Sequence, residues 1–175
     1  MKKMLAIMAF AVMTVAASAQ GTVKMNTFDG KLFSCLYPAD YEAQEQWYDN
    51  CFNAEKNDAL MFDVTLNDQE LTGQNLKDWG EGMKGMIERF AGEPTGWTAE
   101  NPVVKGKTLT IRATKEEEIY DEEKEEDVKL MLVKVTFVVN TPQKKCFSGS
   151  LTFPLSEEAA YKTALEKMFS SFKAK

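Results

Sequence analysis

Three runs of β-branched and aromatic residues follow one another in the C-terminal half of the chain. They read KTLTIRAT from residue 107, VKLMLVKVTFVVN from residue 128 and CFSGSLTFP from residue 146. A turn, Thr-Pro-Gln-Lys-Lys, separates the last two runs, and a strongly charged stretch separates the first two. Such runs with polar connections are typical of antiparallel strands joined by hairpins. We therefore expect residues 107–154 to form the centre of an antiparallel sheet.

Apolar residues at alternate positions predict further strands in the N-terminal half. Phe33, Cys35 and Tyr37 share one face of an expected strand, because successive side chains in a strand point to opposite sides. A short run at 51–55 precedes a clean alternation over residues 60–66. Together with the C-terminal runs, these segments predict a mostly antiparallel sheet of about seven strands.

Two segments repeat their apolar residues at helical spacing instead. The first helix is expected over about 73–91, after Thr72 as N-cap, with a stripe formed by Leu76, Trp79, Met83, Ile87 and Phe90. The second is expected over about 156–172, with a stripe that includes Tyr161, Leu165, Met168 and Phe172. Gly80 lies on the first stripe, which predicts a close approach to another element. Two helices flanking such a sheet define an α+β fold.

The N-terminus has the parts of a secretory signal peptide. Two lysines precede an apolar run from Met4 to Ala17, and small residues lead up to Ala19. This run is too short to span a bilayer comfortably, so we expect cleavage after Ala19 and a secreted or periplasmic protein. The mature chain, residues 20–175, would then be one domain of 156 residues without a transmembrane segment.

Net charge narrows the class of partner. The full chain carries a formal charge of −6, and loss of Lys2 and Lys3 with the signal peptide makes it −8. Nucleic-acid binding depends on lysine and arginine neutralising phosphates, so an acidic chain argues against nucleic acid as a partner. The partner is expected to be an unknown protein or small ligand.

The chain contains no histidine. Serine and cysteine nucleophiles usually need an adjacent base, most often histidine, so this absence removes the common triads. It also removes the histidine-bearing zinc sites. No glycine-rich phosphate loop follows a strand, and no cofactor motif is visible. We expect no catalytic, cofactor-binding or metal-binding residues, and hence a protein that is not an enzyme.

A dense acidic segment interrupts the expected sheet between residues 116 and 127. Nine of its residues are carboxylates and one is a lysine. Three interpretations follow: a solvated hairpin end that prevents edge-to-edge pairing, an electrostatic contact for a basic partner, or a calcium site built from carboxylates, although the spacing is not that of an EF-hand. Ile119 and Tyr120 within the segment would extend the hairpin strands. The candidate contact residues are Asp121, Glu122, Glu123, Glu125, Glu126 and Asp127.

Two further sets of residues are candidates for a specific role. Trp47 and Tyr48 lie in the least periodic segment and are candidate ligand-facing aromatics. Cys35 and Cys51 flank one loop and form a candidate disulfide in an oxidising compartment. The alternative is that these two cysteines and Cys146 are all small buried hydrophobic residues.

The order of elements is similar to that of a known family. With Phe33-Ser34-Cys35-Leu36-Tyr37-Pro38 early and Met168-Phe169-Ser170-Ser171-Phe172 at the end, the chain resembles the PsbP-like α/β/α sandwich family, which includes many bacterial envelope proteins. The resemblance implies a non-catalytic binding or accessory module, but no site residue can be carried over. The alternatives are a carboxylate-dependent hydrolase, with or without calcium, and a structural envelope accessory that docks a basic partner through the acidic hairpin.

Overall fold

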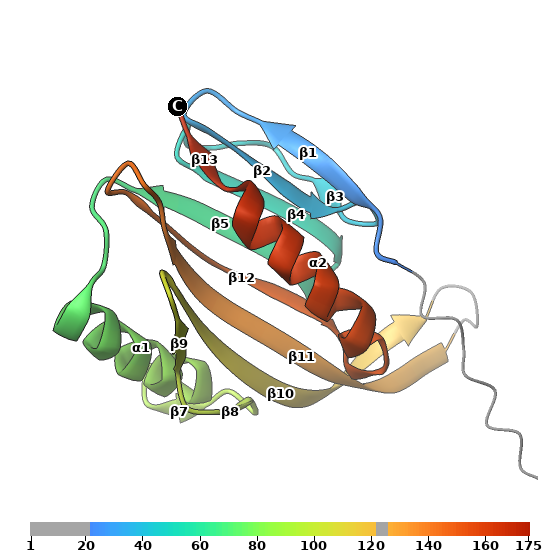
Figure 1. Cartoon of the computed structure of the whole chain (residues 1–175). Coiled ribbons are helices and arrows are strands. Elements are labelled where there is room, and N and C mark those ends of the chain that lie inside the picture. The colour runs from blue at the N-terminus through green and yellow to red at the C-terminus, as the bar shows by residue number, and fades with distance from the viewer. Residues whose placement is uncertain (1–21, 122–125) are drawn as a thin grey trace, which may run out of the picture.

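The computed structural model describes residues 22–121 and 126–175. The predicted signal peptide lies outside them. An antiparallel sheet of eight strands is central, in the order β3-β4-β5-β12-β11-β10-β8, with β9 pairing with β10 (Figure 1). These strands are β3 (Glu42–Ala43), β4 (Cys51–Asn57), β5 (Leu60–Asn67), β8 (Thr98–Ala99), β9 (Val103–Lys105), β10 (Thr108–Asp121), β11 (Glu126–Asn140) and β12 (Cys146–Pro154). The predicted strands of 107–154 therefore lie together, with β11 and β12 inside the sheet.

Helix α2 (Glu158–Ser171) covers one face of this sheet (Figure 1). The odd-numbered residues of β11 from Val133 to Val139 point toward it and are buried. Phe137 is fully buried, with its ring centroid 5.0 Å from that of Phe169 and 5.6 Å from that of Phe172. Burial of each such side chain stabilises the fold by about 1.5–3 kcal/mol. This face is closed by the main hydrophobic core.

A second, three-stranded sheet packs over the same face beside α2. It has the order β1-β2-β13 and comprises β1 (Met25–Asp29), β2 (Phe33–Pro38) and β13 (Lys173–Ala174). Phe33, Cys35 and Tyr37 turn into the main core, as their alternation predicted. The expectation of a mostly antiparallel sheet holds, but the single sheet of about seven strands is corrected to an eight-stranded sheet, this three-stranded one and a two-stranded hairpin in the described residues.

Helix α1 (Gly73–Glu88) covers only part of the opposite face (Figure 1). Leu76 and Ile87 pack there with Leu109 and Ile111 of β10. The close approach predicted at Gly80 is present, because a Cβ built on it would lie 2.9 Å from Leu109 Cδ1. The remainder of this face has no helix over it among the described residues.

Both helices are shorter than predicted. α1 ends at Glu88 because Arg89–Phe90 (β6) and Glu93–Pro94 (β7) form a tight hairpin. Its turn residues Ala91 and Gly92 have φ values of 52° and 89°, which a right-handed helix cannot accommodate. Before α2, residues 155–157 form a 3₁₀ turn, and no side chain caps the helix.

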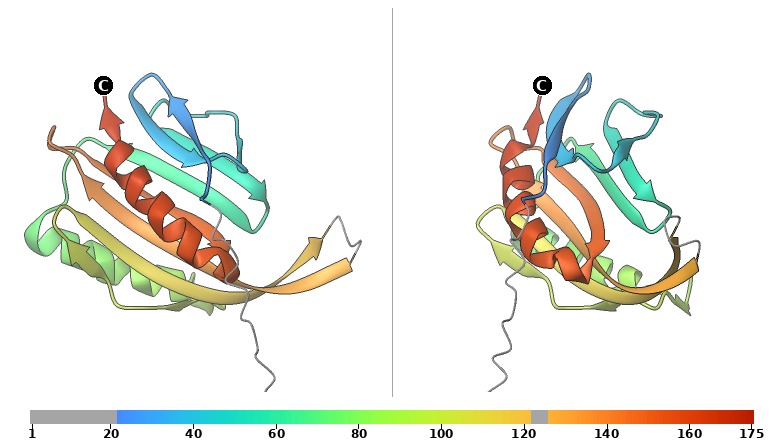
Figure 2. Two further views of the ribbon diagram at one scale, coloured as in Figure 1. Left: turned by 45° about the vertical axis from the view of Figure 1, so that its right-hand side comes forward. Right: turned by 90° about the vertical axis from the view of Figure 1, so that its right-hand side faces the viewer.

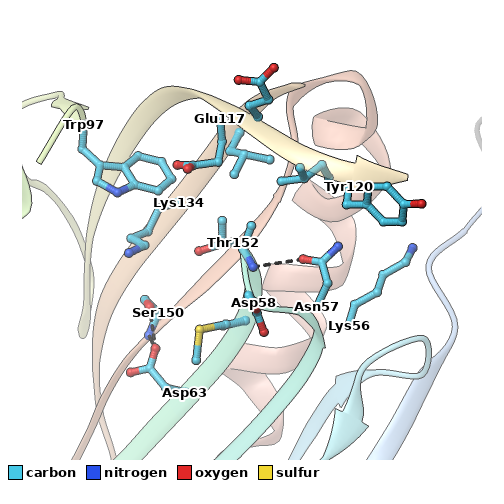
Figure 3. A pocket seen from close by; sticks show the side chains of 15 residues that line it. Lys56, Asn57, Asp58, Asp63, Trp97, Glu117, Tyr120, Lys134, Ser150 and Thr152 are labelled. Carbon is cyan, nitrogen blue, oxygen red and sulfur yellow. Dashed lines mark hydrogen bonds between the residues drawn. The ribbon is translucent and has the colours of Figure 1, made fainter. Parts of the chain in front are cut away.

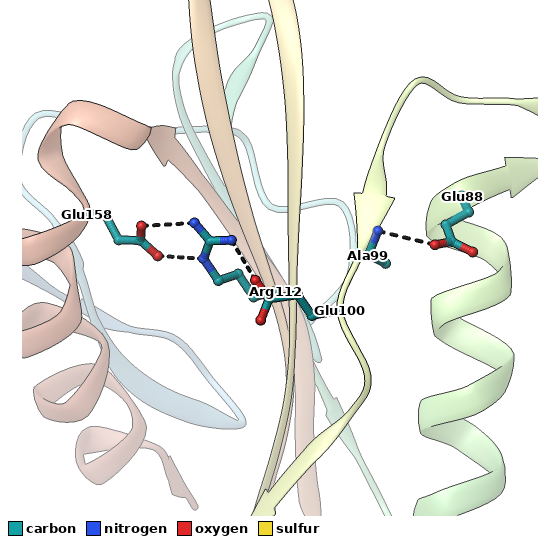
Figure 4. Close-up of polar contacts among 5 residues, drawn as sticks. All are labelled: Glu88, Ala99, Glu100, Arg112 and Glu158. Carbon is teal, nitrogen blue, oxygen red and sulfur yellow. Dashed lines mark hydrogen bonds and ion pairs between the residues drawn. The ribbon is translucent and has the colours of Figure 1, made fainter.

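Arg112 fixes the start of α2 against the sheet (Figure 4). Its Nε and Nη2 donate to the two carboxylate oxygens of Glu158 at 2.6 and 2.9 Å, and its Nη1 donates to Glu100 at 2.7 Å. The guanidinium holds the pKa of Glu158 below its usual range. On the other side, the backbone N–H of Ala99 donates to Glu88 Oε1 at 3.3 Å and ties β8 to the end of α1.

Candidate binding trough on the sheet face

The face that α1 leaves open carries a trough across the centre of the sheet. Two hollows, of about 770 and 500 Å³, share Asp63, Trp97, Lys134 and Ser150 in their linings. Because they share these four residues, we treat them as one continuous depression and call it the sheet-face trough. Its length and its open side suit an extended or protruding ligand better than an enclosed one.

Strand alternation gives the trough a polar floor. Side chains two residues apart along one strand point to the same face, as do residues directly paired on neighbouring strands. The antiparallel registers therefore place the trough residues of β5, β11 and β12 next to one another. The opposite face of the same strands is almost wholly apolar. The floor residues are Asp63, Thr65, Lys134, Thr136, Ser148, Ser150 and Thr152.

Asp63 is held in place by the neighbouring strand (Figure 3). Its Oδ2 accepts a hydrogen bond from the backbone N–H of Ser150 at 3.0 Å and another from the Ser150 hydroxyl. Burial raises the pKa of Asp63, while these hydrogen bonds and the charge of Lys134 oppose the rise. The carboxylate is therefore a fixed, partly desolvated acceptor in the floor.

Lys134 crosses the floor toward Trp97 (Figure 3). Its Nζ lies 4.8 Å from the centroid of the indole, a cation–π geometry. Burial lowers the pKa of Lys134, Asp63 raises it and Lys115 lowers it further. The centre of the trough thus contains one acid and one ammonium that influence each other without a close ion pair.

Large apolar side chains form the wall on the α1 side. They come from one face of α1 and from β6, and two of them remain well exposed: Met86 at 54% and Phe90 at 68%. Aromatic and methionine side chains are the types enriched at protein interfaces. The wall residues are Trp79, Met83, Met86, Ile87 and Phe90.

At its other end the trough lies between two hairpins. The β4–β5 turn supplies residues 56–59 and Met61. Asn57 Oδ1 fixes this turn by accepting from the N–H groups of Ala59 and Leu60 at 3.0 and 2.9 Å (Figure 3). The β10–β11 hairpin supplies residues 117–120. Both contributions are local hairpin geometry and need no ligand to form.

Beyond the end of β12, residues 116–121 and 126–131 pair only with each other in the described part of the chain. We call this two-stranded extension the acidic arm, and Figure 2 shows it continuing past the body of the sheet. Ile119 pairs with Val128 and Tyr120 with Asp127, so these residues do extend the hairpin strands as predicted. The acidic residues beside them in β10 and β11 are therefore strand residues and not turn residues.

Three of the six predicted contact residues lie in the described part of the arm. Asp121 ends β10, and Glu126 and Asp127 begin β11 with exposed side chains. Glu122, Glu123 and Glu125 lie outside the described residues. Within residues 22–121 and 126–175, no three acids or cysteines are grouped so that they could hold a metal ion. The electrostatic role of the arm stays a prediction.

The other sequence candidates lie away from the trough. Trp47 and Tyr48 are 82% and 69% exposed, on the loop between β3 and β4, and neither lines the two hollows. Their role as ligand-facing aromatics stays a prediction. The structure places them on a different surface from Asp63, Trp97 and Lys134.

The proposed disulfide between Cys35 and Cys51 is absent from the structure, in which all three cysteines are free. Cys35 points into the main core, and burial raises the pKa of its thiol to about 12. The Cys51 thiol points to the trough side of the eight-stranded sheet, where it lies 3.4 Å from Thr65 Oγ1. Because these thiols face different environments, the structure does not support the pairing.

Sequence reasoning missed the trough residues. Asp63, Lys134 and Ser150 each interrupt an apolar strand with a polar residue at a trough-facing position. That pattern is a signal that one face of the sheet is not wholly covered. Trp97 comes from an irregular segment, and only the fold shows that it lies over Lys134.

No helix within the described residues is long and apolar enough to cross a membrane.

The fold resembles that of PsbP-like proteins. No family model and no curated protein sequence matches the chain. Among solved structures, it is similar to the Ran-binding protein Mog1p of Saccharomyces cerevisiae, at 12% identity and a TM-score of 0.53, over 87% of this chain and 96% of that one. It is also similar to the cyanobacterial PsbP of Synechocystis, at 11% identity and a TM-score of 0.51, over 91% and 98%. At these identities the similarity shows the fold alone.

Proposed function

We propose that this protein is a non-catalytic binding domain of the cell envelope or the extracellular space, and that it holds part of a partner protein in the sheet-face trough. The observation that carries the proposal is the uncovered wall of interface-type side chains, with Met86 and Phe90 exposed beside a polar floor. Protein interiors bury such residues, so exposed clusters of them mark interaction surfaces.

Two further points support a binding role without catalysis. The chain has no histidine, the usual base beside a serine or cysteine nucleophile. Asp63 Oδ2 already accepts hydrogen bonds from both the backbone N–H and the hydroxyl of Ser150, a role that fixes the floor of the trough. One structural neighbour is named as a Ran-binding protein, which is compatible with a role of this fold in protein recognition. The secretory part of the proposal is supported by the signal-peptide pattern of residues 1–19.

The acidic arm is a second candidate surface for the same class of function. Its residues Tyr120 and Met131 are exposed among acids, and Met131 lines neither hollow of the trough. The charge of the arm would attract a basic partner. A two-stranded extension is also the least supported part of a sheet, because few other elements pack on it. The arm could therefore act as the docking element of an envelope accessory.

Site-specific photocross-linking in intact host cells separates these surfaces. A photoreactive phenylalanine analogue is placed at Met86 in the trough wall, at Met131 on the arm, or at Lys162 on the exposed side of α2 as control. We expect one discrete adduct at Met86 and none at Lys162. In that adduct this protein itself should begin at Gln20, as cleavage of the signal peptide predicts. An adduct at Met131 alone would favour the arm, and equal labelling at all three positions would contradict a specific site.

A further inference from the structure

Lys134 differs from the other lysines of the sheet around it. Lys129 lies 3.6 Å from Glu116, and Lys115 forms an ion pair with Glu117. Within the described residues, Lys134 has no carboxylate at ion-pair distance, and its close contact is the face of Trp97. Its ammonium is half-buried in the floor of the trough and keeps hydrogen-bond donors to offer.

Asp63 does not neutralise Lys134 by contact. One oxygen of that carboxylate is already occupied by the two hydrogen bonds from Ser150. A cation that is partly withdrawn from water is stabilised when a ligand supplies a charge-assisted hydrogen bond. The Lys134 ammonium therefore has no carboxylate in direct contact among the described residues, although Asp63 lies nearby, and a bound partner can supply that contact.

The residues around Lys134 define which side chains should flank an anionic group of the partner that binds there. On one side lie Trp79, Met83 and Met86, which bury best against apolar groups. On the other side lie Asp58, Glu117 and Glu118, which repel additional negative charge. The net charge of the chain also steers acidic partners away at long range, whereas within a Debye length of about 8–10 Å local contacts dominate.

We propose that Lys134 is the binding site for one carboxylate side chain of the partner protein, carried on a segment whose neighbouring residues are apolar and which is otherwise neutral or basic. This inference rests on the proposed function, since it assigns the chemistry of the occupant of the same trough. The occupant is a protein segment and not a free fatty acid, because the trough is an open depression lined with interface residues and not an enclosed apolar cavity.

Three short peptides test the charge assignment. They are acetyl-Phe-Glu-Phe-amide and its analogues with glutamine or lysine at the centre, titrated against ¹⁵N-labelled protein while the indole N–H signal of Trp97 is followed. We expect the glutamate peptide to bind about tenfold more tightly than the glutamine peptide, because a charged group replaces a neutral one opposite a partly desolvated ammonium. Octanoate is titrated as the fatty-acid comparison.

Two variants show whether the discrimination comes from Lys134. In Lys134→Gln the preference for glutamate should disappear, and in the matched control Lys129→Gln, on the same strand, it should persist. Equal affinities, a preference for lysine, a preference that survives Lys134→Gln, or tighter binding of octanoate than of the peptide would each overturn the inference. Absence of any peptide binding at millimolar concentration would also overturn it. A specific adduct at Met86 would still support the trough as the binding surface in all of these cases.

Discussion

Replacement of Phe137 by alanine is expected to lower the free energy of unfolding by about 3–5 kcal/mol. Phe137 is fully buried between the sheet and α2, and its ring contacts those of Phe169 and Phe172. Truncation removes the transfer free energy of the ring and leaves a cavity that the rigid sheet cannot close. Urea denaturation monitored by circular dichroism measures the loss as a lower midpoint at unchanged slope.

Phe90→Ala is the matched control for this change. Phe90 is 68% exposed in the trough wall, so the same truncation there should alter stability by no more than about 0.5 kcal/mol. If both variants lose the same amount, the closed face and the open trough do not differ in the way the structure indicates. This pair therefore tests whether the α2 side is closely packed at Phe137 while the trough wall is open at Phe90.

Gly149→Ala is expected to destabilise the protein by about 3 kcal/mol or more, because the new methyl group meets backbone and cannot displace it without moving β5. A Cβ built on Gly149 would lie 2.0 Å from the carbonyl oxygen of Asp63. The same movement would displace Asp63 from its hydrogen bonds with Ser150. Thermal melting should show a lower transition temperature, and the indole signal of Trp97 should shift as the trough floor rearranges.

Gly82→Ala provides the opposite expectation. Gly82 lies inside α1, and a Cβ built on it would have no neighbouring atom within 4 Å, so alanine should stabilise the helix by about 1 kcal/mol. Destabilisation by Gly82→Ala, or a neutral effect of Gly149→Ala, would contradict the packing described for these two positions.

The helices and the central strands could be predicted from the sequence because their signals are local. The spacing of Tyr161, Leu165 and Met168 identifies the buried side of α2, and these residues are buried as expected. Gly80 on the α1 stripe correctly indicated a close approach. The early end of α1 was missed because it depends on the conformations of Ala91 and Gly92, which helical spacing does not report.

The trough could not be predicted because it depends on where α1 crosses the sheet. The apolar stripe shows that one side of α1 packs against another element. It does not show that α1 leaves Lys134 and Ser150 of the sheet uncovered. The contact between Lys134 and Trp97 joins residues 37 positions apart and follows only from the register of β8, β10 and β11. Cys35 and Cys51 show the same limit, since loop length alone did not reveal which way each thiol points.

The acidic segment is the most conspicuous candidate in the sequence, whereas the structure favours the sheet face. A hairpin that extends beyond its sheet keeps its strands soluble with charge, and the described acids of the arm are consistent with that role. The trough has less charge but combines half-buried polar groups with exposed aromatic and methionine side chains. This combination is what distinguishes it from the rest of the described surface as a site for a partner.

Methionine oxidation tests the trough most directly, because three exposed methionines sample the competing surfaces. Met61 and Met86 line the trough, and Met131 lies on the outer side of the arm with the same 42% exposure as Met61. Hydrogen peroxide treatment of intact host cells and of the purified protein, followed by peptide mass spectrometry, compares their rates. We predict that Met61 and Met86 oxidise several-fold more slowly in cells while Met131 is unchanged. Protection of Met131 alone, or equal rates in cells and in the purified protein at all three positions, would contradict a partner-filled trough.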